Sequence, residues 1–323
     1  MAYLTKLNNR DINTLVYNYK LIDYIKYTPI YEGIQNSNYI LITKNKKYIL
    51  TIFEDQYVIN NLKQYFKLMT FLKEKNFSCP SPIKDIKNNS INSIYGKPYA
   101  LVNFLDGKYL QKHALVHCSQ LGRYIANLHL ITSKYPINIK RRFNKNFYIN
   151  TIKDNHSQIN QYSNNLINLF NKEISELHNI NIPKGIIHGD LFPDNVLFNK
   201  GKIIGFIDFY FSSTDYLITD IAIVIISWCF YSKGNNNIDI NNAKVNEIIK
   251  SYNLVRKISF HELSALNTIC KIYCIRFFLT RLLDYKLKND SQKVLTKDPK
   301  EYINKLLFFV NNNMKFEKIL FNE

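Results

Sequence analysis

The distribution of apolar and polar residues divides the chain into two parts of different character. In residues 30–54, the runs NYILIT and KYILTIFE are rich in β-branched and aromatic residues and flank the polar segment KNK. Such runs predict two antiparallel strands joined by a turn, with GIQNSN as the loop that leads into the first strand. In residues 56–75, apolar side chains recur every three or four positions, which predicts a helix. Further strands are predicted over 83–86, 91–94 and 98–107.

Beyond Gly107 the helical period dominates. The segment 114–130 is amphipathic with a period of about 3.6 residues. Further helices are predicted over 157–180, 215–231, 243–256 and 260–287, and a surface loop is predicted over the asparagine-rich residues 233–242. The pattern therefore predicts an α+β protein with three parts. These are an N-terminal lobe over 1–102 built on a small, mostly antiparallel sheet, a hinge over 103–108, and a mostly helical C-terminal lobe over 109–323.

The strong positive charge does not by itself indicate a nucleic-acid-binding protein. The formal net charge is +18, but the lysines are scattered from Lys6 to Lys318, and the longest basic cluster, IKRRF at 139–143, is short. A nucleic-acid interface would need basic residues gathered on one surface. We therefore expect no nucleic-acid partner.

Neither the cysteines nor the apolar segments indicate secretion or a membrane anchor. The five cysteines are widely spaced and form no CxxC pair, which is typical of a reducing compartment. The N-terminal residues lack the apolar segment of a secretory signal. The most apolar stretch, residues 221–230, is far shorter than the ~20 residues that span a bilayer, and it predicts a buried helix. We expect a cytoplasmic protein with no membrane partner.

Two segments combine glycine with carboxylate and amide side chains: IHGDLFPDNVLF at 187–198 and FIDFY at 206–210. Asn195 follows Asp190 by five residues, and Asp208 follows Asn195 by thirteen. The sequence between them, VLFNKGKIIGFID, predicts a hairpin with its turn at NKG, which would return Asp208 to the end where Asn195 lies. Four of the nine glycines lie around these segments, at 185, 189, 201 and 205, and would let the backbone turn tightly.

This spacing suits phosphoryl transfer from a nucleotide. The reaction needs a base that orients and deprotonates the acceptor hydroxyl, and metal ions that neutralise phosphate charge. Protein kinases supply these groups with His-x-Asp, an asparagine five residues later and a further Asp-Phe-Gly. His188, Asp190, Asn195 and Asp208 follow that order. The simpler interpretation, in which Asp190 and Asp194 are turn residues and Asp208 caps a strand, is disfavoured because four positions and a hairpin would have to coincide.

The same residues carry a family resemblance. IHGDLFPDNVLF followed by IDFYFSSTDYLITDIAI resembles the aminoglycoside phosphotransferase and choline kinase superfamily of small-molecule kinases. Together with FSCP, DFYF and RFFLTRL, the motif is similar to the bacterial homoserine kinases of that superfamily. The resemblance covers most of the chain in order. It implies a two-lobed, protein-kinase-like fold and ATP-dependent phosphorylation of the side-chain hydroxyl of L-homoserine, a step of threonine biosynthesis, with Mg²⁺ as cofactor.

The resemblance also implies roles for individual residues of the C-terminal half. Asp190 would be the catalytic base, and Asn195 and Asp208 would bind Mg²⁺. His188 would brace the catalytic loop without reacting, and Asp220 would hold that loop from the helix that follows.

The implied nucleotide contacts lie in the N-terminal half. They are Gly33, Ser37 and Asn38 over the phosphates, and Asn103, Phe104 and Leu105 beside the adenine. One position departs from the kinase pattern, because Thr51 occupies the place of the strand lysine that usually reaches the phosphates. Lys46 and Lys47 are near it in sequence, but they could equally belong to a solvated turn, which leaves the phosphate-binding cation unassigned.

The implied acceptor carries a carboxylate and an ammonium group. An arginine fork is the best partner for the carboxylate. Arg276 and Arg281 lie five apart in RFFLTRLLD, so on a helix their directions differ by about 140°. One would then bind substrate while the other forms a structural ion pair. Tyr210 and Trp228 are further candidates for the pocket wall, although aromatic residues are more often packed in a core.

Other functions stay open at this point. The acceptor could be choline, ethanolamine or an aminoglycoside, whose cationic groups would need an acidic pocket. An inactive kinase fold that serves as a binding module is a second alternative, which the intact Asp190, Asn195 and Asp208 disfavour. His113 and His117 lie four apart but have no third ligand at zinc-site spacing.

Overall fold

The computed structural model of the chain describes residues 5–31, 36–159, 163–234, 237–289 and 298–321. These residues form two compact units. The first comprises the described part of 1–107 together with 204–210, and the second comprises the described parts of 108–203 and 211–323. The short segment 204–210, which contains Asp208, therefore packs with the first unit although it lies far along the chain.

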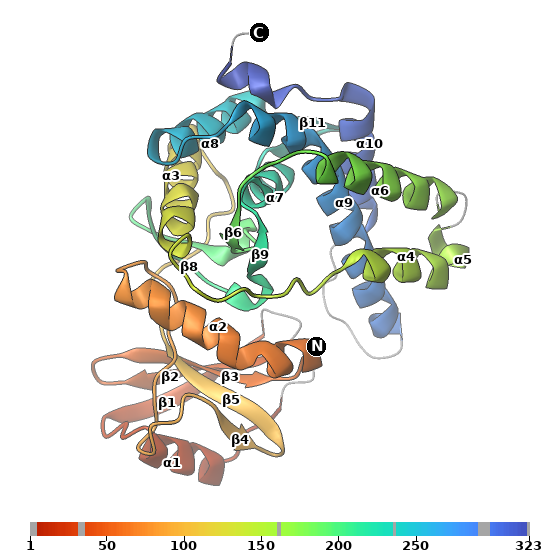
Figure 1. The fold of residues 1–323 in the computed structure, drawn as a ribbon. Coiled ribbons are helices and arrows are strands. Elements are labelled where there is room, and N and C mark those ends of the chain that lie inside the picture. Colours follow the sequence, from red (N-terminus) through yellow and green to blue (C-terminus); the bar gives the residue numbers. More distant parts are fainter. Residues whose placement is uncertain (1–4, 32–35, 160–162, 235–236, 290–297, 322–323) are drawn as a thin grey trace. The chain divides into compact units, whose positions relative to one another are not determined.

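The first unit is built on a five-stranded antiparallel sheet with the strand order β1-β2-β3-β5-β4 (Figure 1). The strands are β1 (Tyr24–Ile30), β2 (Asn36–Thr43), β3 (Lys47–Phe53), β4 (Asn92–Ile94) and β5 (Lys97–Asn103). Strands β2 and β3 form the hairpin that the sequence predicts, with Asn38 opposite Thr51.

Two helices, α1 (Asn9–Asn18) and α2 (Gln56–Glu74), lie on opposite sides of this sheet (Figure 1). Leu50 and Leu101 belong to the core that includes Ile12 and Leu15 of α1. Helix α2 begins at a cap in which the side chain of Asp55 accepts the backbone N–H of Val58. The apolar pattern predicts α2 but not α1, because α1 buries only two of its ten residues.

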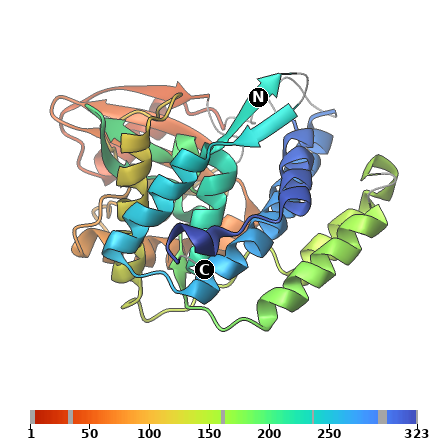
Figure 2. The same cartoon turned by 90° about the horizontal axis from the view of Figure 1, so that it is seen from above.

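The second unit is mostly helical. Its helices are α3 (Leu115–Thr132), α4 (Lys145–Asp154), α5 (His156–Ile159), α6 (Ser163–His178), α7 (Ile218–Trp228), α8 (Asn242–Val255), α9 (Phe260–Asn289) and α10 (Lys300–Asn312). Helices α3 and α8 lie side by side, and α9 packs against α6, α7 and α10 (Figures 1 and 2).

Three further strand pairs are present among the described residues. They are β6 (Lys184–Ile187) with β9 (Ser213–Tyr216), β7 (Val196–Asn199) with β8 (Lys202–Phe206), and β10 (Phe230–Gly234) with β11 (Asn237–Ile240). Among the described residues, short 3₁₀ turns also occur at Pro193–Asn195, Phe209–Phe211 and Phe316–Ile319.

Helices α7 and α9 supply much of the apolar interior of the second unit. Every residue of α7 except Ser227 is buried, which confirms the buried helix predicted for the most apolar stretch of the chain. In α9, Phe260–Asp284 is long and apolar enough to cross a membrane by length and composition, but 83% of its most apolar window is buried inside the protein. That burial is typical of a core helix.

Three predicted elements are wrong. Residues 83–86 form no strand, and only Pro82 makes an isolated bridge to Val102. Residues 213–216 form strand β9 where a helix is predicted from 215, because pairing with β6 overrides the helical period of the apolar residues that follow. Residues 237–240 form β11 where a loop is predicted, because their backbone pairs with β10 despite the asparagine content.

Candidate active site

The motif at 187–198 folds as a strand, a tight loop and a second strand. Strand β6 ends at Ile187, and residues 188–195, which we call the catalytic loop, end in a 3₁₀ turn directly before β7. Strands β7 and β8 are joined by Lys200 and Gly201, which both have positive φ. Two residues of positive φ make a type I′ turn, the kind that best fits the twist of a hairpin. The hairpin predicted between Asn195 and Asp208 is confirmed.

The catalytic loop is anchored by Asp220, a buried residue in the first turn of α7. Its Oδ2 accepts the backbone N–H of His188 at 2.8 Å, and its Oδ1 accepts that of Gly189 at 2.9 Å. His129 Nε2 lies 3.1 Å from Oδ2. Because an ionised carboxylate only accepts, Nε2 carries the proton and the Nδ1 atom accepts from the hydroxyl of Tyr252 at 2.7 Å. These contacts support the structural role predicted for Asp220.

Hydrogen bonding keeps the Asp220 carboxyl ionised in spite of its burial. Burial acts to raise the pKa of this group, but the hydrogen bonds from His129 and Gly189 outweigh it and hold the pKa below its ordinary value. The ionised form is the one that accepts several N–H donors at once. The start of the catalytic loop is therefore fixed by a charge inside the protein.

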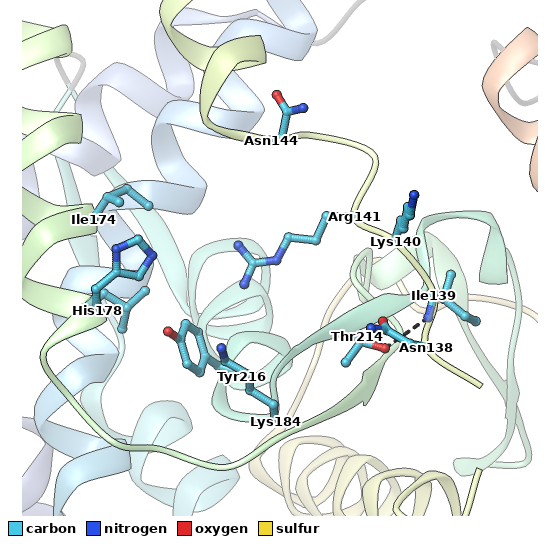
Figure 3. A pocket seen from close by; sticks show the side chains of 11 residues that line it. Asn138, Ile139, Lys140, Arg141, Asn144, Ile174, His178, Lys184, Thr214 and Tyr216 are labelled. Atoms are coloured by element: carbon cyan, nitrogen blue, oxygen red, sulfur yellow. Dashed lines mark hydrogen bonds between the residues drawn. The ribbon is translucent and has the colours of Figure 1, made fainter. Parts of the chain in front are cut away.

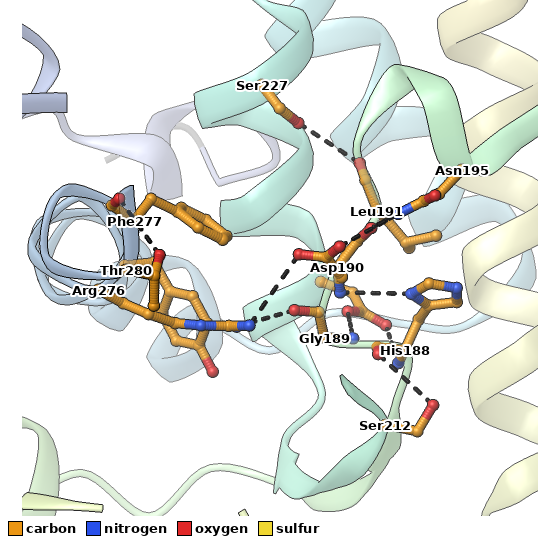
Figure 4. A network of polar contacts seen from close by, with 12 residues as sticks. His188, Gly189, Asp190, Leu191, Asn195, Ser212, Ser227, Arg276, Phe277 and Thr280 are labelled. Carbon is orange, nitrogen blue, oxygen red and sulfur yellow. Dashed lines mark hydrogen bonds and ion pairs between the residues drawn. The ribbon is translucent and has the colours of Figure 1, made fainter. Parts of the chain in front are cut away.

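Asp190 and Asn195 meet across the catalytic loop, as their spacing predicts. The Asn195 Nδ2 atom donates to the backbone oxygen of Asp190 at 2.7 Å and to its Oδ2 atom at 3.1 Å (Figure 4). On the other side, the backbone N–H of Asp190 donates to Nδ1 of the buried His188 at 3.3 Å. The Asp190 carboxylate is thus held in a defined position while 19% of its side chain stays exposed. A positioned, partly exposed carboxylate of this kind is able to serve as a general base.

Helix α7 also holds the middle of the catalytic loop. Trp228 Nε1 donates to the carbonyl oxygen of Leu191 at 3.1 Å, and the Ser227 hydroxyl, which donates to the carbonyl of Ile223 at 2.7 Å, lies 3.4 Å from the Leu191 oxygen. Trp228 is buried and acts here as a support of the loop. The sequence did not reveal this role, because the indole contacts a backbone atom and leaves no side-chain pattern.

Gly189 occupies a position that no other residue fits well. Its φ is +78°, and a Cβ atom there would lie 2.6 Å from the carbonyl oxygen of Phe211. Gly201, in the β7–β8 turn, has a similar φ of +74° but open space around its Cβ position. The two glycines therefore separate the cost of the backbone conformation from the cost of a steric clash.

We expect Gly189→Ala to lower the free energy of unfolding by more than Gly201→Ala, for which the left-handed conformation alone costs about 1–2 kcal/mol. Urea unfolding of both variants measures the difference. Only Gly189→Ala should also lower turnover, because relief of the clash would displace the catalytic loop. Equal losses of stability and activity in the two variants would contradict this account.

Arg276, on α9, connects that helix to the catalytic loop. Its Nη1 atom donates to the carbonyl oxygen of Gly189 at 2.8 Å, and its Nη2 atom lies 4.0 Å from Asp190 Oδ1 (Figure 4). The side chain is only 7% exposed. Arg276 is therefore beside the predicted base, where a substrate ligand is expected.

Arg281 is placed differently. Its Nη1 atom pairs with Glu301 at 2.6 Å, and its Nη2 atom donates to the hydroxyl of Tyr302 at 3.0 Å. Both terminal nitrogens thus take part in contacts with α10. Of the two arginines named from the sequence, Arg281 forms the structural ion pair and Arg276 stays the candidate for substrate.

A cavity of about 240 Å³ opens beside Arg276. We call it the arginine cavity. Its basic lining residues are Arg141, Arg142, Lys145 and Arg276, and no aspartate or glutamate among the described residues lines it. The chain has only seven arginines among its 43 lysines and arginines, and three of the seven line this cavity. The sequence signals Arg141 and Arg142 only as a short basic cluster, because residues distant in sequence complete the cavity.

A second cavity of about 500 Å³ shares Arg141 with the first (Figure 3). Figure 3 shows Arg141 extending from its loop toward Tyr216 and His178. Its Nη2 atom pairs with Asp215, a buried carboxylate that also accepts the hydroxyl of Tyr273 at 3.1 Å. The charge of Arg141 is therefore balanced within the protein by Asp215.

Asp208 and Tyr210 lie in the first unit. Asp208 has a φ of 64°, which is uncommon for a residue other than glycine and is found more often at functional sites. Tyr210 packs edge-on against Phe53 and Tyr65, with ring centroids 5.4 and 5.9 Å apart, and burial raises the pKa of its hydroxyl. These contacts give no support to the substrate role predicted for Tyr210.

Ser37 and Asn38 point to opposite faces of the sheet, because successive side chains of a strand alternate. The buried Ser37 hydroxyl donates to Glu54 at 2.8 Å, and Glu54 also pairs with Lys97 at 2.5 Å. On the other face, Asn38 accepts from the Thr51 hydroxyl at 2.8 Å. Because their side chains point to opposite faces, the two residues do not both face one phosphate, and their phosphate contacts stay a prediction. Gly33, the third residue named for the phosphates, lies outside the described residues.

The residues named for the adenine follow β5. The side-chain oxygen of Asn103 accepts from the backbone N–H and the hydroxyl of Ser81, at 2.6 and 2.8 Å. The carbonyl oxygen of Leu105 accepts the N–H of Gly107 at 2.9 Å. Adenine contacts by these residues stay a prediction.

Lys47 lies at the opposite end of β3 from the residue that pairs with Asn36, where the segment predicted to cover the phosphates enters the sheet. Its ammonium group lies over the ring of Phe104, 5.3 Å from the centroid. Tyr48, the next residue, pairs with Asn103 near the beginning of β3. The segment predicted to cover the phosphates enters β2 at Asn36, and Asn36 pairs with Phe53 at the other end of β3. These contacts give no support to Lys47 as the replacement for the strand lysine, and the phosphate-binding cation stays unassigned.

Comparisons with known proteins show which family the chain belongs to. The model of the phosphotransferase enzyme family matches residues 26–238. A homoserine kinase of Sinorhizobium fredii is 32% identical over 95% of this chain and 94% of its own length, and one of Rhizobium meliloti is 31% identical over the same shares.

Solved structures show the same fold at low sequence identity. An amicoumacin kinase in complex with AMP-PNP and Ca²⁺ has a TM-score of 0.68 and 14% identity, and the match covers 97% of this chain and 93% of that one. A choline kinase of Cryptosporidium parvum has a TM-score of 0.66 and 16% identity, over 97% and 98%. The two-lobed, kinase-like α+β fold predicted from the sequence is confirmed. The chain belongs to the phosphotransferase enzyme family and, within it, to the homoserine kinases.

Proposed function

We propose that this protein transfers the γ-phosphoryl group of ATP to the side-chain hydroxyl of L-homoserine, which yields O-phospho-L-homoserine and ADP. In this reaction the acceptor oxygen forms a bond to the γ-phosphorus, and the bond from that phosphorus to the β–γ bridging oxygen breaks. The hydroxyl proton passes to Asp190. The product serves threonine biosynthesis, and the enzyme acts in the cytoplasm.

The observation that carries this proposal is the lining of the arginine cavity. The cavity lies beside Asp190, since Arg276 belongs to its lining and lies 4.0 Å from the Asp190 carboxylate. A choline or aminoglycoside acceptor is cationic and would need carboxylates there, but the described lining holds only basic, polar and apolar side chains. An acceptor that carries a carboxylate fits these charges.

The catalytic loop has the parts that the proton transfer requires. Asp190 is held by Asn195 on one side and by His188 on the other, so its carboxylate is oriented before the acceptor arrives. Asp220 fixes the backbone from which Asp190 projects. Preorganisation of this kind supplies much of the catalysis in phosphoryl transfer, because little covalent chemistry falls to the protein.

Asn195 and Asp208 carry the kinds of oxygen group that Mg²⁺ prefers. The amide nitrogen of Asn195 donates to Asp190, so its oxygen is the atom suited to a cation. Asp208, after β8, supplies a carboxylate, and Mg²⁺ is usually held by one or two such groups together with substrate phosphates. When bound, the ion would neutralise charge on the β- and γ-phosphates. Asn195 and Asp208 are the residues we propose to hold it.

The proposal is tested by the release of ADP from ATP and Mg²⁺ with L-homoserine, L-serine, choline, ethanolamine and kanamycin as acceptors. We expect selective turnover of L-homoserine. EDTA should abolish that turnover, and excess Mg²⁺ should restore it. Turnover of choline or kanamycin without turnover of L-homoserine would contradict the proposed acceptor, and activity that persists in EDTA would contradict the proposed metal.

A further inference from the structure

We propose that Tyr252 and Arg256 are positioning residues for the phosphoryl transfer. They act through His129 and Asp220, the pair that anchors the catalytic loop. The inference rests on the proposed function, because it assigns further residues to that reaction. Tyr252 lies in α8 and Arg256 caps the C-terminal end of that helix. The sequence places both only in a predicted helix over 243–256, and no motif singles them out.

A continuous chain of hydrogen bonds connects the end of α8 to the catalytic loop. Arg256 Nη1 donates to the hydroxyl of Tyr252 at 3.2 Å, and that hydroxyl lies 2.7 Å from His129 Nδ1. His129 Nε2 lies 3.1 Å from the Asp220 carboxylate, which accepts the backbone N–H groups at the start of the loop. Tyr252, His129 and Asp220 are each at most 1% exposed, so solvent has little access to these bonds. We call these four residues the anchor chain.

The partners of Tyr252 fix the direction of the anchor chain. A guanidinium group only donates, so the hydroxyl oxygen is the acceptor for Arg256. The single hydroxyl proton is then available to Nδ1 of His129, and the ring proton is on Nε2, which faces Asp220. Burial raises the pKa of the Tyr252 hydroxyl, which keeps that proton in place. His129 is therefore held in one tautomer and one orientation.

Arg256 supplies a positive charge at the far end of the anchor chain. It pairs with Glu262 at 2.8 Å, and its side chain is 13% exposed. Burial acts to lower the pKa of Arg256, but Tyr252 and Glu262 outweigh it and hold the pKa above its ordinary value. A charged donor polarises the hydroxyl that it contacts, and each bond in such a series strengthens the next. Arg256 thus strengthens the hydrogen bond that His129 donates to the catalytic-loop anchor.

The contact between Tyr252 and His129 requires a close approach of α3 and α8, which lie side by side (Figure 1). Gly122 precedes His129 by seven residues in α3, so both lie on the same face of that helix, two turns apart. A Cβ atom at Gly122 would lie 2.4 Å from the carbonyl oxygen of Ile248 and 2.2 Å from the hydroxyl of Ser251, both in α8. A side chain at position 122 would therefore push apart the two helices that the anchor chain joins.

Tyr252→Phe removes the hydroxyl and keeps the ring. We expect kcat for L-homoserine to fall by about 10- to 100-fold and KM to stay within about threefold of wild type. The reason is that the loop that carries Asp190 loses its fixed orientation, while the groups proposed to bind the substrates are unchanged. Steady-state kinetics measures both constants. Unchanged kcat in this variant would overturn the inference.

Tyr19→Phe is the matched control for loss of a buried tyrosine hydroxyl. Tyr19 belongs to the first unit, and its hydroxyl accepts from Asn92 at 3.1 Å. We expect this variant to lose stability but to keep kcat close to wild type. An equal fall of kcat in Tyr19→Phe and Tyr252→Phe would overturn the inference, because the effect would then follow from destabilisation alone.

Gly122→Ala breaks the same contact from the other helix. It should lower kcat as well, and the double variant with Tyr252→Phe should be no slower than the slower of the two single variants. Changes that interrupt one shared contact are not additive, whereas changes at independent sites are. Losses of kcat that multiply in the double variant would overturn the inference.

The direction of the anchor chain can be measured in the wild-type protein without substrate. Nitrogen NMR spectroscopy distinguishes a ring nitrogen that carries a proton from one that does not, and the chain has only seven histidines. We expect His129 at neutral pH to carry its proton on Nε2 and none on Nδ1. A proton on Nδ1 would overturn the inference, because Tyr252 could not then donate to that atom.

These outcomes are distinguishable from failure of the proposed function. Wild-type protein that phosphorylates L-homoserine, while His129 carries a proton on Nδ1, keeps the function and removes the anchor chain. Wild-type protein that does not phosphorylate L-homoserine, but shows the expected protonation of His129, removes the function and supports the anchor chain as the support of the catalytic loop.

Discussion

Replacing Asp190 with asparagine is expected to lower kcat for L-homoserine by about 10²- to 10⁴-fold, or roughly 3–5 kcal/mol of transition-state stabilisation. The amide has nearly the shape of the carboxylate but cannot accept the hydroxyl proton. Since Asn195 and His188 hold this residue mainly through its backbone, the fold should be intact. Steady-state kinetics together with thermal unfolding measures both effects.

Asp194 provides the matched control for this experiment. It lies in the same loop, four residues further on, and is exposed. Asp194→Asn removes the same charge from the same segment, and we expect turnover close to wild type. Near-normal turnover by Asp190→Asn would refute the assigned base. Equal losses in both variants would instead indicate that the negative charge of the loop, and not a particular base, matters.

Asp220→Asn is expected to lower the free energy of unfolding by about 3–5 kcal/mol. The carboxylate accepts from His188, Gly189 and His129, whereas the amide has one acceptor oxygen and turns an N–H₂ group toward the remaining donors. A loss of this size is a large part of the ~5–15 kcal/mol that stabilises a typical domain. Urea unfolding at neutral pH measures it, and turnover should fall with it because the catalytic loop loses its anchor.

The pH dependence of this effect has a definite sign. The pKa of the Asp220 carboxyl is lower in the folded protein than its ordinary value of 3.8. Its contribution to stability is therefore fully present above that value and is lost as the pH falls through the lower folded pKa. The difference in unfolding free energy between wild type and Asp220→Asn should be constant from neutral pH down to 3.8 and shrink below it.

Asp239→Asn, on the partly exposed strand β11, is the control for loss of a carboxylate. Asp239 pairs with Lys233 at the surface, so we expect little change in stability from its replacement. If the difference in unfolding free energy between wild type and Asp220→Asn instead grows as the pH falls toward 3.8, the buried carboxyl is not the source of the stabilisation.

The sequence predicts the catalytic loop well because that part of the site is local. Asp190 and Asn195 meet within a single turn of chain, so their spacing alone encodes the contact. The β7–β8 hairpin is equally local, and its turn residues identify it. The same reasoning predicts α2, α3, α8 and α9, whose apolar positions repeat along one helix.

The arginine cavity could not be predicted in this way. Arg142 and Arg276 are separated by more than 130 residues, and they meet at Phe143 and Phe211 only through the packing of the second unit. The separation of Arg276 from Arg281 on the helix is predictable, but which of the two faces the loop depends on Glu301 in α10. Strands β9 and β11 were missed for the same reason, since partners in the fold override their local preference.

The contact of Arg276 with the Gly189 carbonyl has a consequence for attempts to redesign the acceptor range of this enzyme. One residue joins the wall of the cavity to the backbone that carries the base, so a change at 276 alters specificity and rate together. Libraries that vary 276 should consist mostly of slow enzymes, whatever acceptor they favour.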